Sequence, residues 1–330
     1  MRVFISVDME GISGVERLEE VFRGQPGYEI FRQIMAGDVN AAAQGAIDAG
    51  ATDVVVSDSH AFMCNIRPKD VHSEATLRSG LQRAMCQYKG FSNRFDAVFL
   101  VGIHAKANTA GAIMPHTWIP AFEDVRVNGE SVGEGGLNAY LAGHFGVPVA
   151  LVAGDDKALE QTKEVLGEGP EYVEVKKSTG PSSGVHLPIH ESHARIRQAA
   201  KRALAKNRVT PIPVRHAELP IRLELDLADR VDDPDNAIVR QNDRFSDFGV
   251  DRALSDIGLV ASLEDVEVSG PKTVAWTSTS YLEAYNSLFG ALQHFYERGL
   301  EWLIEEVAEP AAYHRDLSEL IEKDASLNYL

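Results

Sequence analysis

The chain has 330 residues, of which 44% are hydrophobic and 25% are charged, a composition typical of a globular protein with one or two domains. Asp and Glu outnumber Lys and Arg by 49 to 32, which gives a net charge of −17. This excess argues against binding to nucleic acid or to an anionic membrane, because both require clustered cations. No apolar run reaches the ~18 residues of a membrane span. Two cysteines argue against a disulfide framework, and the apolar run before Asp8 is too short for a signal peptide, so we expect a cytoplasmic protein.

The first 60 residues predict a strand, a helix and a second strand. Residues 2–7 and 53–57 are short apolar runs typical of buried strands. Between them, apolar residues recur at spacings of three and four over 28–49, which predicts a helix with one apolar face that ends at Gly50. This order of elements indicates a right-handed crossover between parallel strands.

The next 100 residues continue this pattern and add a hairpin. Residues 95–103 predict a third buried strand, and Asn128-Gly129 predicts the turn of a hairpin between residues 125–127 and 130–132. A helix over 134–145 and a fourth strand over 147–152 follow. Residues 1–155 therefore predict an α/β unit built on a mostly parallel sheet with flanking helices.

The second half of the chain has a different sequence pattern. The Ser, Gly and Pro residues of 178–186 predict a loop and a domain boundary, and residues 190–206 predict a helix. Apolar and polar residues alternate over 221–227, which is typical of an antiparallel strand with one solvated face. Residues 231–256 are polar and give no clear assignment, whereas 281–295 carry a helical apolar stripe.

These patterns predict three parts of the chain. They are an α/β catalytic domain over 1–185, a smaller α+β domain over 186–300 that contributes to the substrate pocket and to assembly, and an acidic tail over 301–330.

Histidines and carboxylates gather where the predicted strands end. Asp8 and Glu10 follow the first strand, His60 follows the second, His104 follows the third, and Glu134 opens the helix after the hairpin. Ligands of open parallel sheets bind at the carboxyl ends of the strands, so these five side chains should converge.

The types of these residues indicate a metal site. Imidazole and carboxylate ligands suit Zn²⁺, and also Mn²⁺ or Co²⁺. Five ligands exceed the three or four that one zinc ion takes from a protein, which favours two metal ions that activate a water molecule. Each residue also has a structural explanation by itself, such as a turn, a loop contact or a helix start.

Three other residues allow more than one interpretation. His116 follows a glycine-containing loop and is either a surface residue or a general acid or base beside the metals. Asp155 is best explained as a helix cap. Lys106 is the one cation close to the ligand-bearing segments, which argues against a phosphoester substrate because phosphate binding needs a cationic clamp.

Five stretches of the chain, in the same order, resemble the zinc D-aminopeptidases encoded with bacterial dipeptide-transport genes. They are residues 6–14 (SVDMEGISG), 58–60 (DSH), 102–105 (GIHA), 133–140 (GEGGLNAY) and 152–156 (VAGDD). The similarity covers most of residues 1–300 and is weakest over 178–260.

The resemblance implies roles for the residues in these stretches. Asp8, Glu10, His60, His104 and Glu134 would be the ligands of two zinc ions per subunit, with Asp8 between them, and His116 would be the catalytic histidine. Met114-Pro115 stands before His116, where the family carries Ser next to the histidine. The resemblance also implies a ring-shaped homo-oligomer.

We therefore expect a zinc aminopeptidase that hydrolyses short peptides with an N-terminal D-amino acid by means of a zinc-activated water. The alternatives are a metal-dependent hydrolase of another amide or ester bond and a non-catalytic peptide-binding relative.

Overall fold

A computed structural model describes residues 1–25, 27–80, 85–227 and 266–290, and every structural statement below concerns these residues. In chain order the elements are β1 (Arg2–Val7), η1 (Leu18–Glu20), α1 (Tyr28–Asp48), β2 (Asp53–Asp58), β3 (Ala75–Arg78), η2 (Cys86–Tyr88), β4 (Ala97–Ile103), β5 (Phe122–Val127), β6 (Glu130–Ser131), α2 (Glu134–His144), β7 (Val149–Asp155), α3 (Asp156–Leu166), β8 (Glu171–Gly180), β9 (Ser183–His186), α4 (Ile189–Val209), β10 (Ile221–Leu227), β11 (Val266–Val268) and β12 (Thr273–Ser278). Residues 281–290 are also helical.

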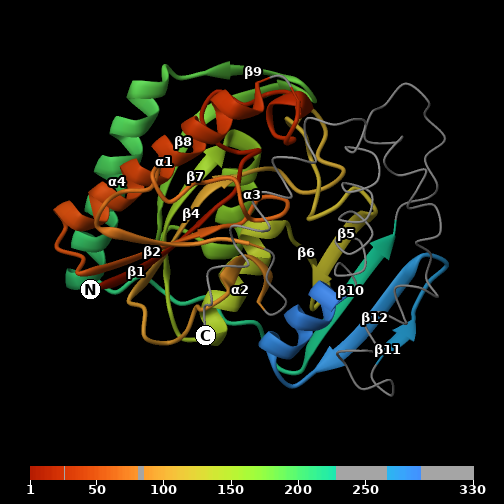
Figure 1. Ribbon diagram of the computed structural model, residues 1–330. Coiled ribbons are helices and arrows are strands. Elements are labelled where there is room, and N and C mark those ends of the chain that lie inside the picture. Colours follow the sequence, from red (N-terminus) through yellow and green to blue (C-terminus); the bar gives the residue numbers. More distant parts are fainter. Residues whose placement is uncertain (26, 81–84, 228–265, 291–330) are drawn as a thin grey trace, which may run out of the picture.

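The larger sheet has the strand order β3-β2-β1-β4-β7-β8-β9 and is parallel except for β9. Helices α1 and α4 cover one face, and α2 and α3 lie on the other (Figure 1). The central strands are buried on both faces: Val3, Ile5 and Val7 pack under α1 and α4, whereas Phe4 belongs to the core on the opposite side. The predicted α/β class is therefore confirmed.

Helix α1 follows the predicted stripe, with Met35, Val39 and Ala42 fully buried. Two positions, one in α1 and one just after it, show why glycine is needed. A Cβ at Gly45 would lie 2.3 Å from the Arg197 carbonyl oxygen of α4, so glycine lets the two helices pack closely. Gly50 has a φ of +83° directly after the helix, as predicted for a C′ glycine.

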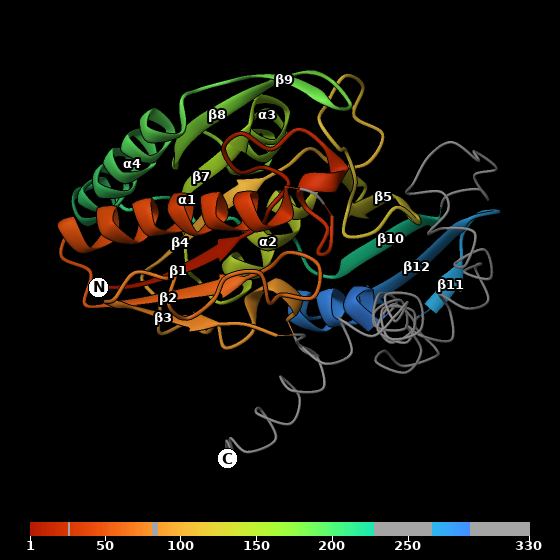
Figure 2. The same cartoon turned by 45° about the horizontal axis from the view of Figure 1, so that its top comes forward.

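A second, antiparallel sheet has the strand order β11-β12-β10-β5-β6. The predicted β5–β6 hairpin turns at Asn128 and Gly129, which both have positive φ. Strand β10 alternates between buried and half-buried residues as predicted, and the Arg126 guanidinium of β5 donates to the Asp226 carboxylate of β10 at 2.5 and 3.0 Å. This sheet lies beside the larger one (Figure 2), and one apolar core joins them through α2.

The antiparallel sheet combines strands from residues 122–131, 221–227 and 266–278. Residues 122–131 belong to the proposed catalytic domain and the other two stretches to the proposed second domain. The division into domains at residues 185 and 300 remains a prediction.

The prediction of a loop over 178–186 is wrong. Strand β8 continues to Gly180 and forms a tight hairpin with β9, because each strand gains a hydrogen-bonded neighbour at the edge of the sheet. The polar segment 231–256, the acidic tail 301–330 and the end of the helix predicted over 281–295 lie outside the described residues. Among the helices that are described, none has the length and apolarity that a membrane span requires.

Candidate metal centre

The candidate site lies at the carboxyl ends of the three central parallel strands. Strand β1 pairs in parallel with β2 on one side and with β4 on the other, so Asp8, His60 and His104 leave the sheet at the same edge. The chain winds toward β2 and β3 on one side of β1 and toward β4 and β7 on the other. This change of direction is the switch point at which open α/β sheets bind ligands.

His60 faces two of the carboxylates. Its Nδ1 lies 3.3 Å from Asp8 Oδ1 and 2.9 Å from Glu10 Oε2. Its Nε2 lies 2.9 Å from the Val21 carbonyl oxygen, which can only accept a hydrogen bond, so Nε2 carries a proton. In the neutral imidazole, Nδ1 therefore presents its lone pair to the two carboxylates.

His104 repeats this arrangement with the ring nitrogens exchanged. Its Nδ1 donates to the Ala105 carbonyl oxygen at 3.0 Å. Its Nε2 lies 3.2 Å from Glu134 Oε1 and 3.6 Å from Asp8 Oδ2, and this buried atom has no hydrogen-bond partner among the described residues. Metal-binding histidines typically donate the other ring N–H to a carbonyl or carboxylate in this way.

His116 joins the same group from the loop before β5. Its ring stacks on that of His104 with the centroids 4.1 Å apart, and its Nδ1 donates to the Met114 carbonyl oxygen at 2.9 Å. Its Nε2 is thus left facing Glu10 Oε1 at 3.7 Å. It is more exposed than the other two histidines, with 23% of its side chain accessible against 4% for His60 and 1% for His104.

The six residues form overlapping groups that could each hold a metal ion. One consists of Asp8, Glu10 and His60, and a second of Asp8, His104 and Glu134, with the candidate ligand atoms within 4.8 Å of one another in each. Asp8 belongs to both groups. A third group joins Glu10, His104 and His116. The structure thus brings together all six residues that the sequence predicts, and the donor set fits two divalent cations.

The charges in this cluster are strongly coupled. Burial alone would lower the pKa of both histidines, but Glu10 and Asp8 raise that of His60, and Glu134 and Asp8 raise that of His104, to well above the ordinary histidine value. Burial would raise the pKa of Glu10, but His60 above all, with His116 and His104, lowers it. The carboxylates therefore require positive charge at the ring nitrogens that face them, and a metal cation would supply it in place of protons.

Several buried residues that the sequence analysis missed hold the ligand-bearing loops. Lys176 of β8 donates from Nζ to the carbonyl oxygens of Glu10 and Val15 at 2.5 and 2.6 Å. Asp38 of α1 accepts hydrogen bonds from the backbone N–H and the hydroxyl of Ser13, at 2.8 and 2.9 Å. Burial lowers the pKa of Lys176 to about 8, although Asp155 and Glu10 oppose the shift. A lysine in a strand of mixed polar and apolar residues and an aspartate in a helix carry no local signal of such a role.

Asp58 holds the loop that carries His60. Its buried carboxylate accepts the backbone N–H groups of Asn65 and Ile66 at 2.5 and 2.8 Å, and so closes the loop that carries His60. Asp155 caps α3 by accepting the Ala158 N–H at 2.8 Å, as predicted. Lys106 donates from Nζ to the hydroxyl and carbonyl oxygens of Ser131, so its ammonium is already paired.

The fold and the site together define an α/β protein with a buried cluster of histidines and carboxylates at a sheet switch point. The family model for D-aminopeptidase matches residues 1–258, and the chain belongs to this family.

Comparisons of sequence and of structure both find similarity to D-aminopeptidase from Bacillus subtilis. A curated D-aminopeptidase of strain 168 is 40% identical over 166 residues, which span 50% of this chain and 60% of that protein. The solved structure of the zinc-dependent D-aminopeptidase DppA, described as a self-compartmentalizing protease, matches with a TM-score of 0.77 and 28% identity over 89% of this chain and 97% of that one.

Proposed function

We propose that this chain is a zinc-dependent aminopeptidase that removes an N-terminal D-amino acid from short peptides, with two zinc ions per subunit. The observation that carries the proposal is the shared arrangement of the three histidines. Each donates one ring N–H to a backbone carbonyl and turns its other nitrogen toward a carboxylate. His60 faces one oxygen of Asp8, and His104 faces the other. Membership of the D-aminopeptidase family supports the substrate class.

In this proposal Glu10 and His60 would hold one zinc ion and His104 and Glu134 the other, with Asp8 shared between the two groups. Mn²⁺ and Co²⁺ suit the same ligands. When bound, zinc would supply a lowered pKa of water and polarisation of the scissile carbonyl.

His116 would supply the proton transfer. Because its Nδ1–H is held by the Met114 carbonyl, Nε2 is the atom free to take and return a proton. Its greater exposure than that of His60 and His104 is consistent with access to substrate.

The assembly and the location of the protein are inferred from its relatives and its composition. The self-compartmentalizing DppA supports a ring-shaped homo-oligomer of this chain, and the sequence pattern favours a cytoplasmic protein that handles peptides. A phosphoester substrate is disfavoured because both Lys106 and Lys176 donate to oxygens of the protein itself.

The decisive experiment compares D- and L-aminoacyl p-nitroanilides and the matching dipeptides. The protein is assayed as purified, after prolonged chelation, and after zinc is returned, with zinc measured in each sample. We expect cleavage of the D-series, about two zinc ions per chain on the ligand count, and loss and recovery of activity with the metal. Activity that survives removal of all metal refutes the metal-dependent mechanism, and equal cleavage of the L-series refutes the stereochemical assignment.

A further inference from the structure

A chain of buried hydrogen bonds leads away from Glu134 to the helical segment 281–290. Gln87 of η2 donates from Nε2 to Glu134 Oε2 at 2.6 Å. Asn138 of α2 donates from Nδ2 to Gln87 Oε1 at 2.5 Å, and the Tyr285 hydroxyl donates to Asn138 Oδ1 at 3.1 Å. All three donor residues are at most 4% exposed.

The direction of every bond in this chain is fixed by its end at a carboxylate. Glu134 can only accept from Gln87, so the Gln87 amide turns its NH₂ group toward Glu134 and its oxygen toward Asn138. The same reasoning turns the Asn138 oxygen toward the tyrosine hydroxyl. Burial raises the pKa of Tyr285 well above its ordinary value, so its hydroxyl keeps the proton that it donates.

Tyr285 also supports the other oxygen of Glu134. Glu134 Oε1 accepts the backbone N–H of Trp118 at 2.8 Å, and this is the oxygen that faces His104. The Trp118 ring packs edge-on against Tyr285, with the ring centroids 5.3 Å apart. Both carboxylate oxygens are therefore held through contacts that trace back to one tyrosine.

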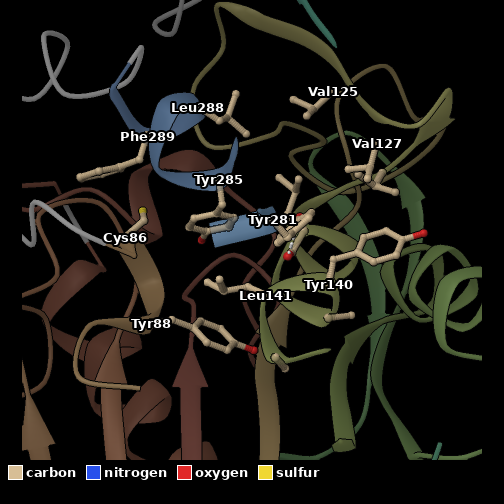
Figure 3. Close-up of a cluster of buried hydrophobic side chains, with 14 of the residues drawn as sticks. Cys86, Tyr88, Val125, Val127, Tyr140, Leu141, Tyr281, Tyr285, Leu288 and Phe289 are labelled. Atoms are coloured by element: carbon tan, nitrogen blue, oxygen red, sulfur yellow. Dashed lines mark hydrogen bonds between the residues drawn. The ribbon is translucent and has the colours of Figure 1, made fainter. Parts of the chain in front are cut away.

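The segment around Tyr285 is well placed to transmit this support. Tyr281, Tyr285 and Leu288 lie on the helical segment 281–290, and their buried side chains pack into the core formed with α2 (Figure 3). Asn286 of the same segment accepts the backbone N–H of Met85 at 2.8 Å, just before η2, which carries Gln87. The Ser57 hydroxyl donates to the Gln87 carbonyl at 2.9 Å, so the backbone at Gln87 is tied down independently of its side chain.

From these contacts we infer that Gln87, Asn138 and Tyr285 are positioning residues for Glu134, which set the affinity of the zinc subsite formed by Asp8, His104 and Glu134. The inference rests on the proposed function for the identity of the metal. A donor chain that ends on Glu134 Oε2 fixes the rotation of the carboxylate and keeps Oε1 directed at the metal position. Substitutions of residues that orient metal ligands typically weaken metal binding roughly 10- to 100-fold.

Two tyrosines of the segment 281–290 provide a matched pair of variants for the test. Tyr281 and Tyr285 lie one helical turn apart, both are buried, and both donate from the hydroxyl. Tyr281 donates to the Leu137 backbone carbonyl at 3.0 Å, outside the hydrogen-bond chain. Tyr281→Phe and Tyr285→Phe thus make the same chemical change in the same core, and only the second interrupts the support of Glu134.

The measurement is the affinity of the full-length protein for each zinc ion that it binds, obtained by competition with a chromophoric chelator, together with urea unfolding of the metal-free protein. We expect Gln87→Met to weaken zinc binding roughly 10- to 100-fold. Tyr285→Phe should weaken it by a smaller factor, and Tyr281→Phe should leave it unchanged despite a similar loss of stability. Of the three variants, only Tyr281→Phe should retain the wild-type zinc affinity.

Equal zinc affinities for Tyr281→Phe and Tyr285→Phe, at whatever value, would overturn the inference. Because the readout is metal binding, it does not depend on peptide cleavage. A wild-type protein that binds zinc but cleaves no peptide contradicts the aminopeptidase assignment and leaves this comparison valid. Cleavage by the wild type with identical zinc affinities in all variants contradicts the positioning role alone.

Discussion

Replacement of Lys176 by methionine tests how strongly the core holds the loop that carries Asp8 and Glu10. Lys176 is 1% exposed, and its ammonium bonds the carbonyl oxygens of Glu10 and Val15. Methionine retains most of the length and apolar stem of lysine but donates no hydrogen bond. The substitution therefore removes the two bonds and leaves two carbonyl oxygens facing an apolar side chain.

The size of the effect follows from the two bonds that are lost. A hydrogen bond to a charged group contributes about 1.5–3 kcal/mol, so the pair contributes about 3–6 kcal/mol. Removal of the buried charge offsets part of this loss, because folding of the variant no longer removes water from an ammonium group. We expect the free energy of unfolding of Lys176→Met to fall by about 2–4 kcal/mol.

Urea unfolding of the metal-free variants measures this loss, and zinc content after dialysis shows whether the loop still holds metal. Lys177→Met is the matched control, because Lys177 is the next residue on β8 and its side chain is exposed. We expect the control to change the free energy of unfolding by less than about 0.5 kcal/mol, as surface substitutions usually do. Equal stability and equal zinc content in the two variants would refute the role of Lys176 in holding this loop.

Further substitutions separate the roles within the site. Asp8→Ala and His104→Ala should lose zinc, as measured by metal analysis after gel filtration, and retention of two zinc ions by Asp8→Ala would exclude a bridging carboxylate. His116→Ala should retain zinc but lose roughly 10²–10⁴-fold in turnover, and release of zinc by this variant would make His116 a ligand. Gly11→Ala should prevent native folding, seen as loss of a cooperative unfolding transition, because its Cβ would lie 2.1 Å from the Ile103 carbonyl oxygen; a soluble, zinc-loaded Gly11→Ala protein would contradict this packing argument.

Local patterns predict the elements whose burial is evident in the sequence. The stripe over 28–49 corresponds to α1, which buries one face, and the apolar runs at 2–7, 53–57 and 95–103 correspond to strands that are buried on both faces. Four of the candidate site residues, Asp8, Glu10, His60 and His104, could be predicted because the ends of parallel strands meet at one edge of the sheet. Glu134 opens the helix after the hairpin, and the role of His116 comes from the family resemblance.

Long-range pairing could not be predicted from these patterns. The hairpin at Asn128-Gly129 is evident from its turn residues, but its pairing with β10, nearly a hundred residues later, depends on the Arg126–Asp226 contact and on the shared core. The Ser and Gly residues of 178–186 predict a loop, yet pairing at the edge of the sheet extends β8 and adds β9. Tertiary contacts overrode local propensity there.

The residues that support the candidate ligands are harder to predict than the candidate ligands themselves. His60 and His104 stand at positions that topology makes informative, whereas Gln87 lies in the short helix η2, 47 residues from Glu134 in the sequence. What makes Gln87 important is that its amide completes a donor chain that only the folded core assembles. A carboxylate that serves a metal with one oxygen needs its other oxygen held by a donor, so a search of the core for donors to each candidate ligand finds such residues where sequence spacing does not.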